Sequence, residues 1–116
     1  MANYRMEKVN HDIQRILSEI IRDDVNDPNV DKMCSVMKAE VTKDLKYAKA
    51  YISVFGDEDK NKKTVDALNK AAGFIKHRLS EIMKTKSVPT VKFLVDNSIR
   101  YSIEIAQKLE DIEHEQ

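Results

Sequence analysis

The chain contains few of the residues on which stapled, metal-bound or membrane-embedded proteins depend. Its 116 residues include one cysteine, Cys34, with two glycines, two prolines and no tryptophan. A single cysteine excludes an internal disulfide, and a lone thiol is typical of a reducing compartment. No apolar run approaches the roughly 18 residues of a membrane span, and the charged start lacks the apolar stretch of a secretory signal. We therefore expect a cytoplasmic protein that does not enter the membrane.

Motifs for catalysis and metal binding are also missing. The three histidines have no HExxH spacing, so we expect no bound metal. An EF-hand that began at Asp24 would need glycine and glutamate where Asn29 and Ser35 stand. Two glycines are too few for the usual phosphate loops and nucleophile elbows. We predict that the protein is not an enzyme, needs no cofactor, and uses Cys34 as a small core residue.

Hydrophobic periodicity predicts one α+β domain over residues 1–116. Apolar residues recur every three or four positions near the N-terminus and again after residue 64, as in helices with one buried face. Two intervening stretches alternate in polarity as half-buried strands do. The predicted elements are a helix over Arg5–Val25, strands over Met33–Thr42 and Lys46–Phe55 with a turn at Lys43–Lys46, a helical stripe over Val65–Met83, a strand over Val91–Val95 and a last helix from Ile99.

Two features refine this prediction. Met37 is expected to face the core with Ala39 and Val41, and the polar run Asp57–Lys63 is expected to be a loop. Gly73 interrupts the second helical stripe, where glycine costs about 1 kcal/mol relative to alanine, so we interpret it as a kink or a close approach at which two helices meet. The resulting order is αββααβα, with helices packed on a three-stranded sheet. The acidic end, residues 110–116, is expected to fray.

Charge is balanced overall but unevenly distributed. Twenty Lys and Arg residues match twenty Asp and Glu residues. Residues 1–59 carry a net −3, residues 60–92 carry +7, and residues 93–116 carry −4. At cellular salt each charge acts over only about 8 Å, so a basic central segment creates a local positive surface in a neutral protein. One face of the domain can therefore attract phosphate groups.

Four stretches together resemble the ribosome-binding factor A family. They are DPNV at Asp27–Val30, VTKDLKYAKAYISVF at Val41–Phe55, ALNKAAGFIKHRL at Ala67–Leu79 and FLVDNSI at Phe93–Ile99. The element order without the last helix is that of the KH fold in its second topology. This chain lacks the GxxG loop of ordinary KH domains, and the family's substitute is an Ala-x-Gly kink, here Ala71, Ala72 and Gly73. Arg100 and Ser102 stand where the family usually has an acidic residue, after DxS-x, and then a small one. Any role of that acidic residue is therefore not carried over to this chain.

The resemblance implies a maturation factor for the small ribosomal subunit. Family members bind structured ribosomal RNA near the decoding region through a basic face and promote processing of the RNA's 5′ end. The resemblance also implies a part in cold adaptation and release by a GTPase, whose identity the sequence does not give. We further predict a monomer.

Lysines and one arginine near the kink and the hairpin turn are the candidate RNA ligands. The first group lies on or beside the predicted kinked helices, and the second surrounds the turn, where Tyr47 or Tyr51 offers a ring for base stacking. The candidates are Lys70, Lys76, Arg78, Lys84 and Lys86 in the first group and Lys43, Lys46 and Lys49 in the second. Lys60, Lys62 and Lys63 fall in the predicted loop, and Arg5 and Lys8 open the first helix; all five stay outside this set.

Each candidate has a plainer interpretation. A run of lysines is more often a solvated helix face, and a tyrosine on a small sheet more often covers apolar neighbours than stacks on RNA. Two other functions also remain open: a protein-interaction module that docks the first or last helix in a partner groove, and a ribosome hibernation factor. Steep salt dependence separates RNA binding from groove docking. Association with idle mature ribosomes distinguishes hibernation.

Overall fold

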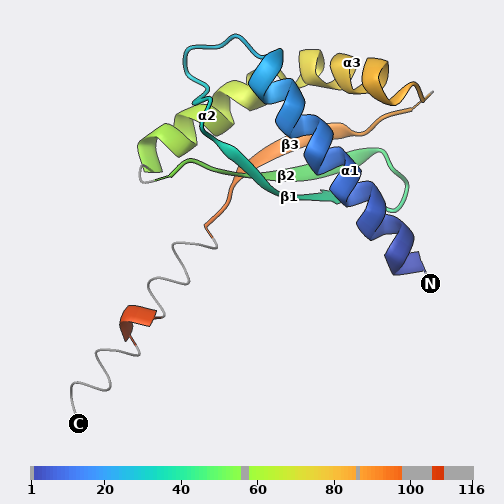
Figure 1. The fold of residues 1–116 in the computed structure, drawn as a ribbon, viewed down its shortest axis with the longest axis horizontal. Coiled ribbons are helices and arrows are strands. Elements are labelled where there is room, and N and C mark those ends of the chain that lie inside the picture. The colour runs from blue at the N-terminus through green and yellow to red at the C-terminus, as the bar shows by residue number, and fades with distance from the viewer. Residues whose placement is uncertain (1, 56–57, 86, 98–105, 109–116) are drawn as a thin grey trace.

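Three helices pack on one three-stranded sheet in the order αββααβ (Figure 1). The computed structural model describes residues 2–55, 58–85, 87–97 and 106–108. The elements are α1 (Ala2–Asp23), β1 (Ser35–Val41), β2 (Tyr47–Ser53), α2 (Glu58–Lys70), α3 (Ala72–Met83) and β3 (Thr90–Val95). The predicted α+β class and this order are confirmed. The predicted last helix, with Arg100 and Ser102, lies outside the described residues except for a helical stretch at residues 106–108.

Helix α1 is amphipathic, and its apolar stripe packs mainly on β1 and α3. Ile13, Leu17 and Ile20 are at most 1% exposed, which follows from their spacing of three and four residues. The C-terminal end of α1 is closed by Lys32. Its ammonium group donates to the carbonyls of Ile21 at 3.1 Å, Arg22 at 3.4 Å, and Val25. A cation is favourable there because the last carbonyls of a helix carry partial negative charge.

The sheet has the order β1-β2-β3, with β1 antiparallel and β3 parallel to β2. A bulge between Val36 and Lys38 shifts the register of β1. The prediction that Met37 faces the core is therefore wrong, because the bulge turns Val36 inward and leaves Met37 40% exposed. Cys34 also differs from expectation. It precedes β1 and is only half-buried, although it packs against the core.

Side-chain amides tie both edges of the sheet to helices. On the β1 edge, Asn10 accepts a hydrogen bond from Val41 N at 2.9 Å, and Gln14 donates to Val36 O at 2.8 Å. On the β3 edge, Asn69 of α2 donates to Phe93 O at 3.0 Å and accepts from Phe93 N at 2.8 Å. These bonds occupy backbone groups that an open edge strand would offer to another chain.

The second helical stripe consists of two helices, as predicted, but the break lies at Ala71. This residue has φ −92° and ψ 9°, outside regular helix, and α3 restarts at Ala72. The expectation of a loop at Asp57–Lys63 is wrong for residues 58–63, since α2 begins at Glu58 and includes Lys60, Lys62 and Lys63. Asp57 lies outside the described residues. The first turn of α2 carries Glu58 and Asp59, and acidic residues there stabilise a helix through its dipole.

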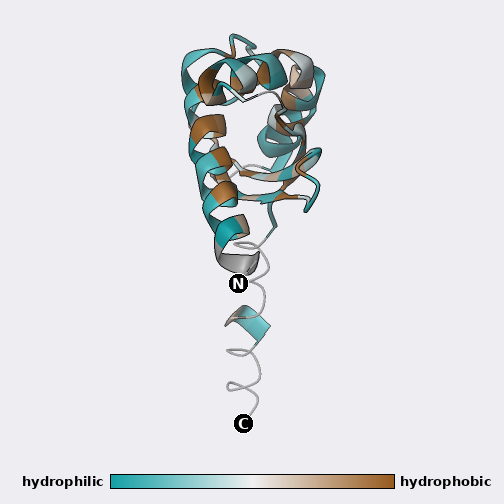
Figure 2. Ribbon diagram, turned by 90° about the vertical axis from the view of Figure 1, so that its right-hand side faces the viewer, coloured by the Kyte–Doolittle hydropathy of each residue, from teal (hydrophilic) through white to brown (hydrophobic). Residues whose placement is uncertain are grey.

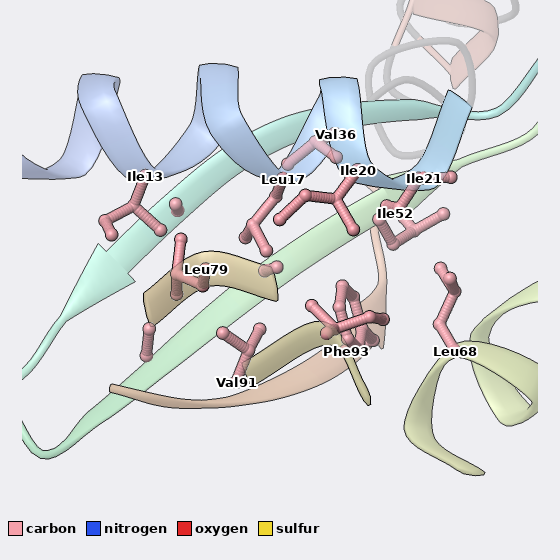
Figure 3. Packing of buried hydrophobic residues seen from close by; sticks show 14 of the residues in the cluster. Ile13, Leu17, Ile20, Ile21, Val36, Ile52, Leu68, Leu79, Val91 and Phe93 are labelled. Atoms are coloured by element: carbon pink, nitrogen blue, oxygen red, sulfur yellow. The ribbon is translucent and has the colours of Figure 1, made fainter. Parts of the chain in front are cut away.

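The core lies between the helices and the inner face of the sheet. Figure 3 shows Leu17 and Ile20 from α1, Leu79 from α3, and Val91 and Phe93 from β3 directed into one cluster. Figure 2 shows hydrophobic and hydrophilic segments alternating along α1, as in an amphipathic helix. Phe93 is fully buried, and truncating such a residue to alanine typically costs about 3 to 5 kcal/mol. Phe74 and Ile82, two apolar residues of the helical stripe predicted over Val65–Met83, are instead 47% and 37% exposed.

Candidate nucleic-acid interface

The β1–β2 turn holds its lysines on a locally hydrogen-bonded frame. Asp44 accepts hydrogen bonds from Thr42 Oγ1 at 2.6 Å and from Lys46 N at 3.0 Å. The bond from Thr42 is the main reason that the pKa of Asp44 lies below its ordinary value. Leu45 completes the turn with a positive φ of 62°. The one carboxylate of the turn is thus engaged in shaping it, while Lys43 and Lys46 are exposed.

Thr90 joins this turn to helix α3. Its N–H donates to Lys46 O at 2.9 Å, and its Oγ1 accepts from Lys76 Nζ at 3.0 Å. In Figure 1 the hairpin turn, the end of α3 and the start of β3 lie at the same end of the domain. The backbone of Lys46 and the ammonium group of Lys76, thirty positions apart in sequence, therefore contact the same residue.

Two further lysines extend this region across the sheet. Lys49 on β2 is the register partner of Lys92 on β3, and both are exposed. Within the described residues neither has an ion-pair partner. We call Lys43, Lys46, Lys49, Lys76, Thr90 and Lys92 the Thr90 surface. Sequence reasoning missed Thr90 and Lys92, because only the parallel pairing of β3 with β2 places them beside the hairpin.

The other predicted ligands do not join this surface through any described contact. Arg78 lies about 200° around the helix axis from Lys76 and bonds Asp24 of α1 through Nε at 3.0 Å. That hydrogen bond raises the pKa of Arg78 above its ordinary value, and Glu81, at 3.4 Å, adds to the effect. Lys70 is exposed at the end of α2, and Lys84 is exposed just after α3 with a positive φ of 55°. Lys86 lies outside the described residues.

Gly73 borders an open hollow rather than forming the kink. It is exposed in the first turn of α3, its φ is not positive, and a Cβ at this position would have no neighbour within 4 Å. The hollow, of about 400 Å³, is lined by Gly73, Lys76, His77, Ser80, Ser87 and Val88. The expectation that the kink lies at Gly73 is wrong, because the break lies at Ala71. Ala71 and Ala72 are half-buried, and Ala71 packs against the core.

The described residues can be compared with the requirements of a metal site and of a membrane span. No three of their His, Cys, Asp or Glu side chains gather as a metal site would require. None of the helices there combines the length and apolar character of a bilayer span.

The fold defines a small α+β domain in which three helices cover one face of a three-stranded sheet. The family model described as ribosome-binding factor A matches residues 5–109. The curated ribosome-binding factor A of Clostridium acetobutylicum is 43% identical over 112 residues, which cover 97% of this chain and 93% of that protein. The chain therefore belongs to the ribosome-binding factor A family.

Solved structures agree with this fold. The crystal structure of ribosome-binding factor A from Thermus thermophilus matches with a TM-score of 0.67 and 21% identity, covering 78% of this chain and 93% of that one. A Thermus thermophilus homology model of the same factor, fitted into a cryo-electron microscopy map of its 30S complex, matches with a TM-score of 0.63 and 22% identity. That match covers 76% of this chain and 91% of the other.

Proposed function

We propose that this protein binds the ribosomal RNA of the immature small ribosomal subunit and assists its late maturation, including processing of the RNA's 5′ end. Family membership supports this function, as does the 30S complex of the Thermus thermophilus factor. The observation that carries it is the meeting of Lys46 and Lys76 at Thr90. Two basic segments far apart in sequence thus lie next to each other in the fold.

The chemistry of the Thr90 surface suits RNA phosphates. Its five lysines carry positive charge at neutral pH. The ammonium group of Lys76 uses one donor on Thr90 Oγ1 and keeps further N–H groups for a phosphate oxygen. Thr90 is exposed, and its hydroxyl proton stays available to donate as well. Such contacts fix position on RNA without reading its sequence.

Gly73 favours close approach of RNA at α3. Its open hollow adjoins Lys76, and a residue without a side chain lets another backbone come near. We propose as secondary RNA contacts Lys70, Lys84, Lys86 and Arg78. Of these, Arg78 already forms an ion pair with Asp24. We propose that the protein acts as a cytoplasmic monomer and that a GTPase releases it.

Sedimentation of cell lysate tests the proposed function. The protein should travel with immature small subunits at low salt, and a strain without it should accumulate RNA with an unprocessed 5′ end. Association with idle mature ribosomes would instead favour a hibernation factor. Recovery only in ribosome-free fractions at low salt would overturn the proposal.

A further inference from the structure

The outer face of the sheet is not covered by any described helix. Ala48, Ala50 and Ile52 of β2 are at most 2% exposed and face the core, so alternate residues of β2 point the other way. Those residues include Tyr47 and Tyr51. The outward face therefore combines aromatic side chains with Lys49 and Lys92 of the Thr90 surface.

The two tyrosines differ in environment. Tyr51 is half-buried, which fits a ring that covers apolar neighbours. Tyr47 is 60% exposed, although both polar groups of its backbone are bound by Thr42: its carbonyl accepts from Thr42 N at 2.8 Å, and its N–H donates to Thr42 Oγ1 at 3.2 Å. The ring of Tyr47 is thus carried on a fixed backbone while its own surface remains largely open.

A hollow of about 320 Å³ lies beside this ring, lined by Tyr47, Ala48, Lys49, Thr90, Lys92 and the end of β1. Its volume falls at the lower end of the range of small-molecule sites. Glu40 also lines it, but this carboxylate is 2.8 Å from the ammonium group of Lys38. Lys49 and Lys92, in contrast, make no ion pair within the described residues. The rim is therefore positive on the β2–β3 side.

We propose that an unpaired RNA nucleotide stacks its base on the Tyr47 ring in this hollow, while its neighbouring phosphates contact Lys49 and Lys92. An exposed ring flanked by cations is the arrangement by which proteins hold single-stranded nucleic acid. Because Thr90 borders the hollow and also contacts Lys76, a strand can pass from α3 onto the outer sheet. This inference rests on the proposed function and adds a single-stranded contact to it.

Titration of the full chain with a fluorescently labelled oligoadenylate tests the inference. Tyr47→Ala should weaken binding by roughly ten- to a hundredfold, the usual loss for one stacked base. The slope of log affinity against log salt should stay unchanged, because the ring carries no charge. Tyr47→Phe should bind like the parent. Phe55→Ala, which removes a ring that is 98% exposed beyond the end of β2, should also leave affinity unchanged.

Nuclear magnetic resonance on the unaltered protein gives a second readout. The ring protons of Tyr47 should shift upfield when the oligoadenylate is added, and those of Tyr51 should move less. Unchanged affinity of a folded Tyr47→Ala variant, or ring signals of Tyr47 that do not move, would overturn the inference. If the parent fails to bind the oligoadenylate but still sediments with immature subunits, the stacking site is wrong and the proposed function stands.

Discussion

Asn69 shows how one polar side chain completes an edge strand. Its amide makes both hydrogen bonds that a further strand would offer to Phe93. Asn69→Ala should therefore lower the free energy of unfolding by about 1 to 3 kcal/mol, because the Phe93 backbone groups lose their partners. Urea denaturation followed by circular dichroism measures this. Asn26→Ala, at an exposed loop position, is the matched control and should change stability by less than about 0.5 kcal/mol.

Cys34 should behave as a slow nucleophile. Burial is the main cause that raises the pKa of its thiol, and the charge of Asp31 raises it further. The thiol of the unfolded chain loses its proton at lower pH than the thiol of the folded protein. The contribution of Cys34 to stability is therefore complete below the unfolded pKa of about 8.5 and declines as pH rises above it. Iodoacetamide should label the native protein more slowly than the urea-unfolded protein at a pH of about 8, just below that pKa. Equal rates would show that the thiol is not protected.

At the scale of elements, Gly73 should limit the stability of α3. Its backbone is not in the left-handed region and its surroundings are open, so Gly73→Ala should raise the free energy of unfolding by up to about 1 kcal/mol. The same change should weaken binding to small subunits if RNA approaches the hollow at this residue. A thermal melt and a subunit binding assay on one preparation separate the two effects. A lower melting temperature would contradict the structural assignment of Gly73.

Two cations on α3 should differ in what they stabilise. Arg78 joins α3 to α1 through Asp24, with side chains that are 32% and 28% exposed, whereas Lys76 bonds only the Thr90 hydroxyl among the described residues. Arg78→Met should therefore destabilise the fold more than Lys76→Met, and Lys76→Met should weaken RNA binding more. Urea denaturation and subunit binding of the two variants test this. The reverse order in either assay would contradict the division.

The elements of the fold were largely predictable because local periodicity determines them. The strands of the hairpin, the helical stripe over Val65–Met83 and the strand at Val91–Val95 follow from the spacing of apolar residues. The bulge beside Met37 and the break at Ala71 were not, because both depend on how β1 and α2 pack against the rest of the domain. The kink was predicted at Gly73 because the residue is a glycine, yet its backbone conformation is ordinary.

At the scale of the whole molecule, the candidate site could be predicted only in part from the sequence. Lys43, Lys46 and Lys76 stand out in sequence through their basic neighbourhood. Their association depends on the parallel pairing of β2 with β3, which brings Thr90 beside Lys46 and Lys92 beside Lys49. Such long-range pairing leaves no local signal. A sequence count of charge likewise cannot tell that Arg78 is matched by Asp24.

The salt dependence of binding to immature small subunits tests the central claim that the Thr90 surface holds RNA phosphates. Lys46→Met with Lys76→Met should weaken binding and flatten the slope of log affinity against log salt by roughly 1.4 to 1.8, at about 0.7 to 0.9 for each lost phosphate contact. The control pair Lys62→Met and Lys63→Met changes net charge equally on exposed positions of α2 and should leave the slope near that of the parent. A slope equally flattened by both pairs, or by neither, would contradict the claim.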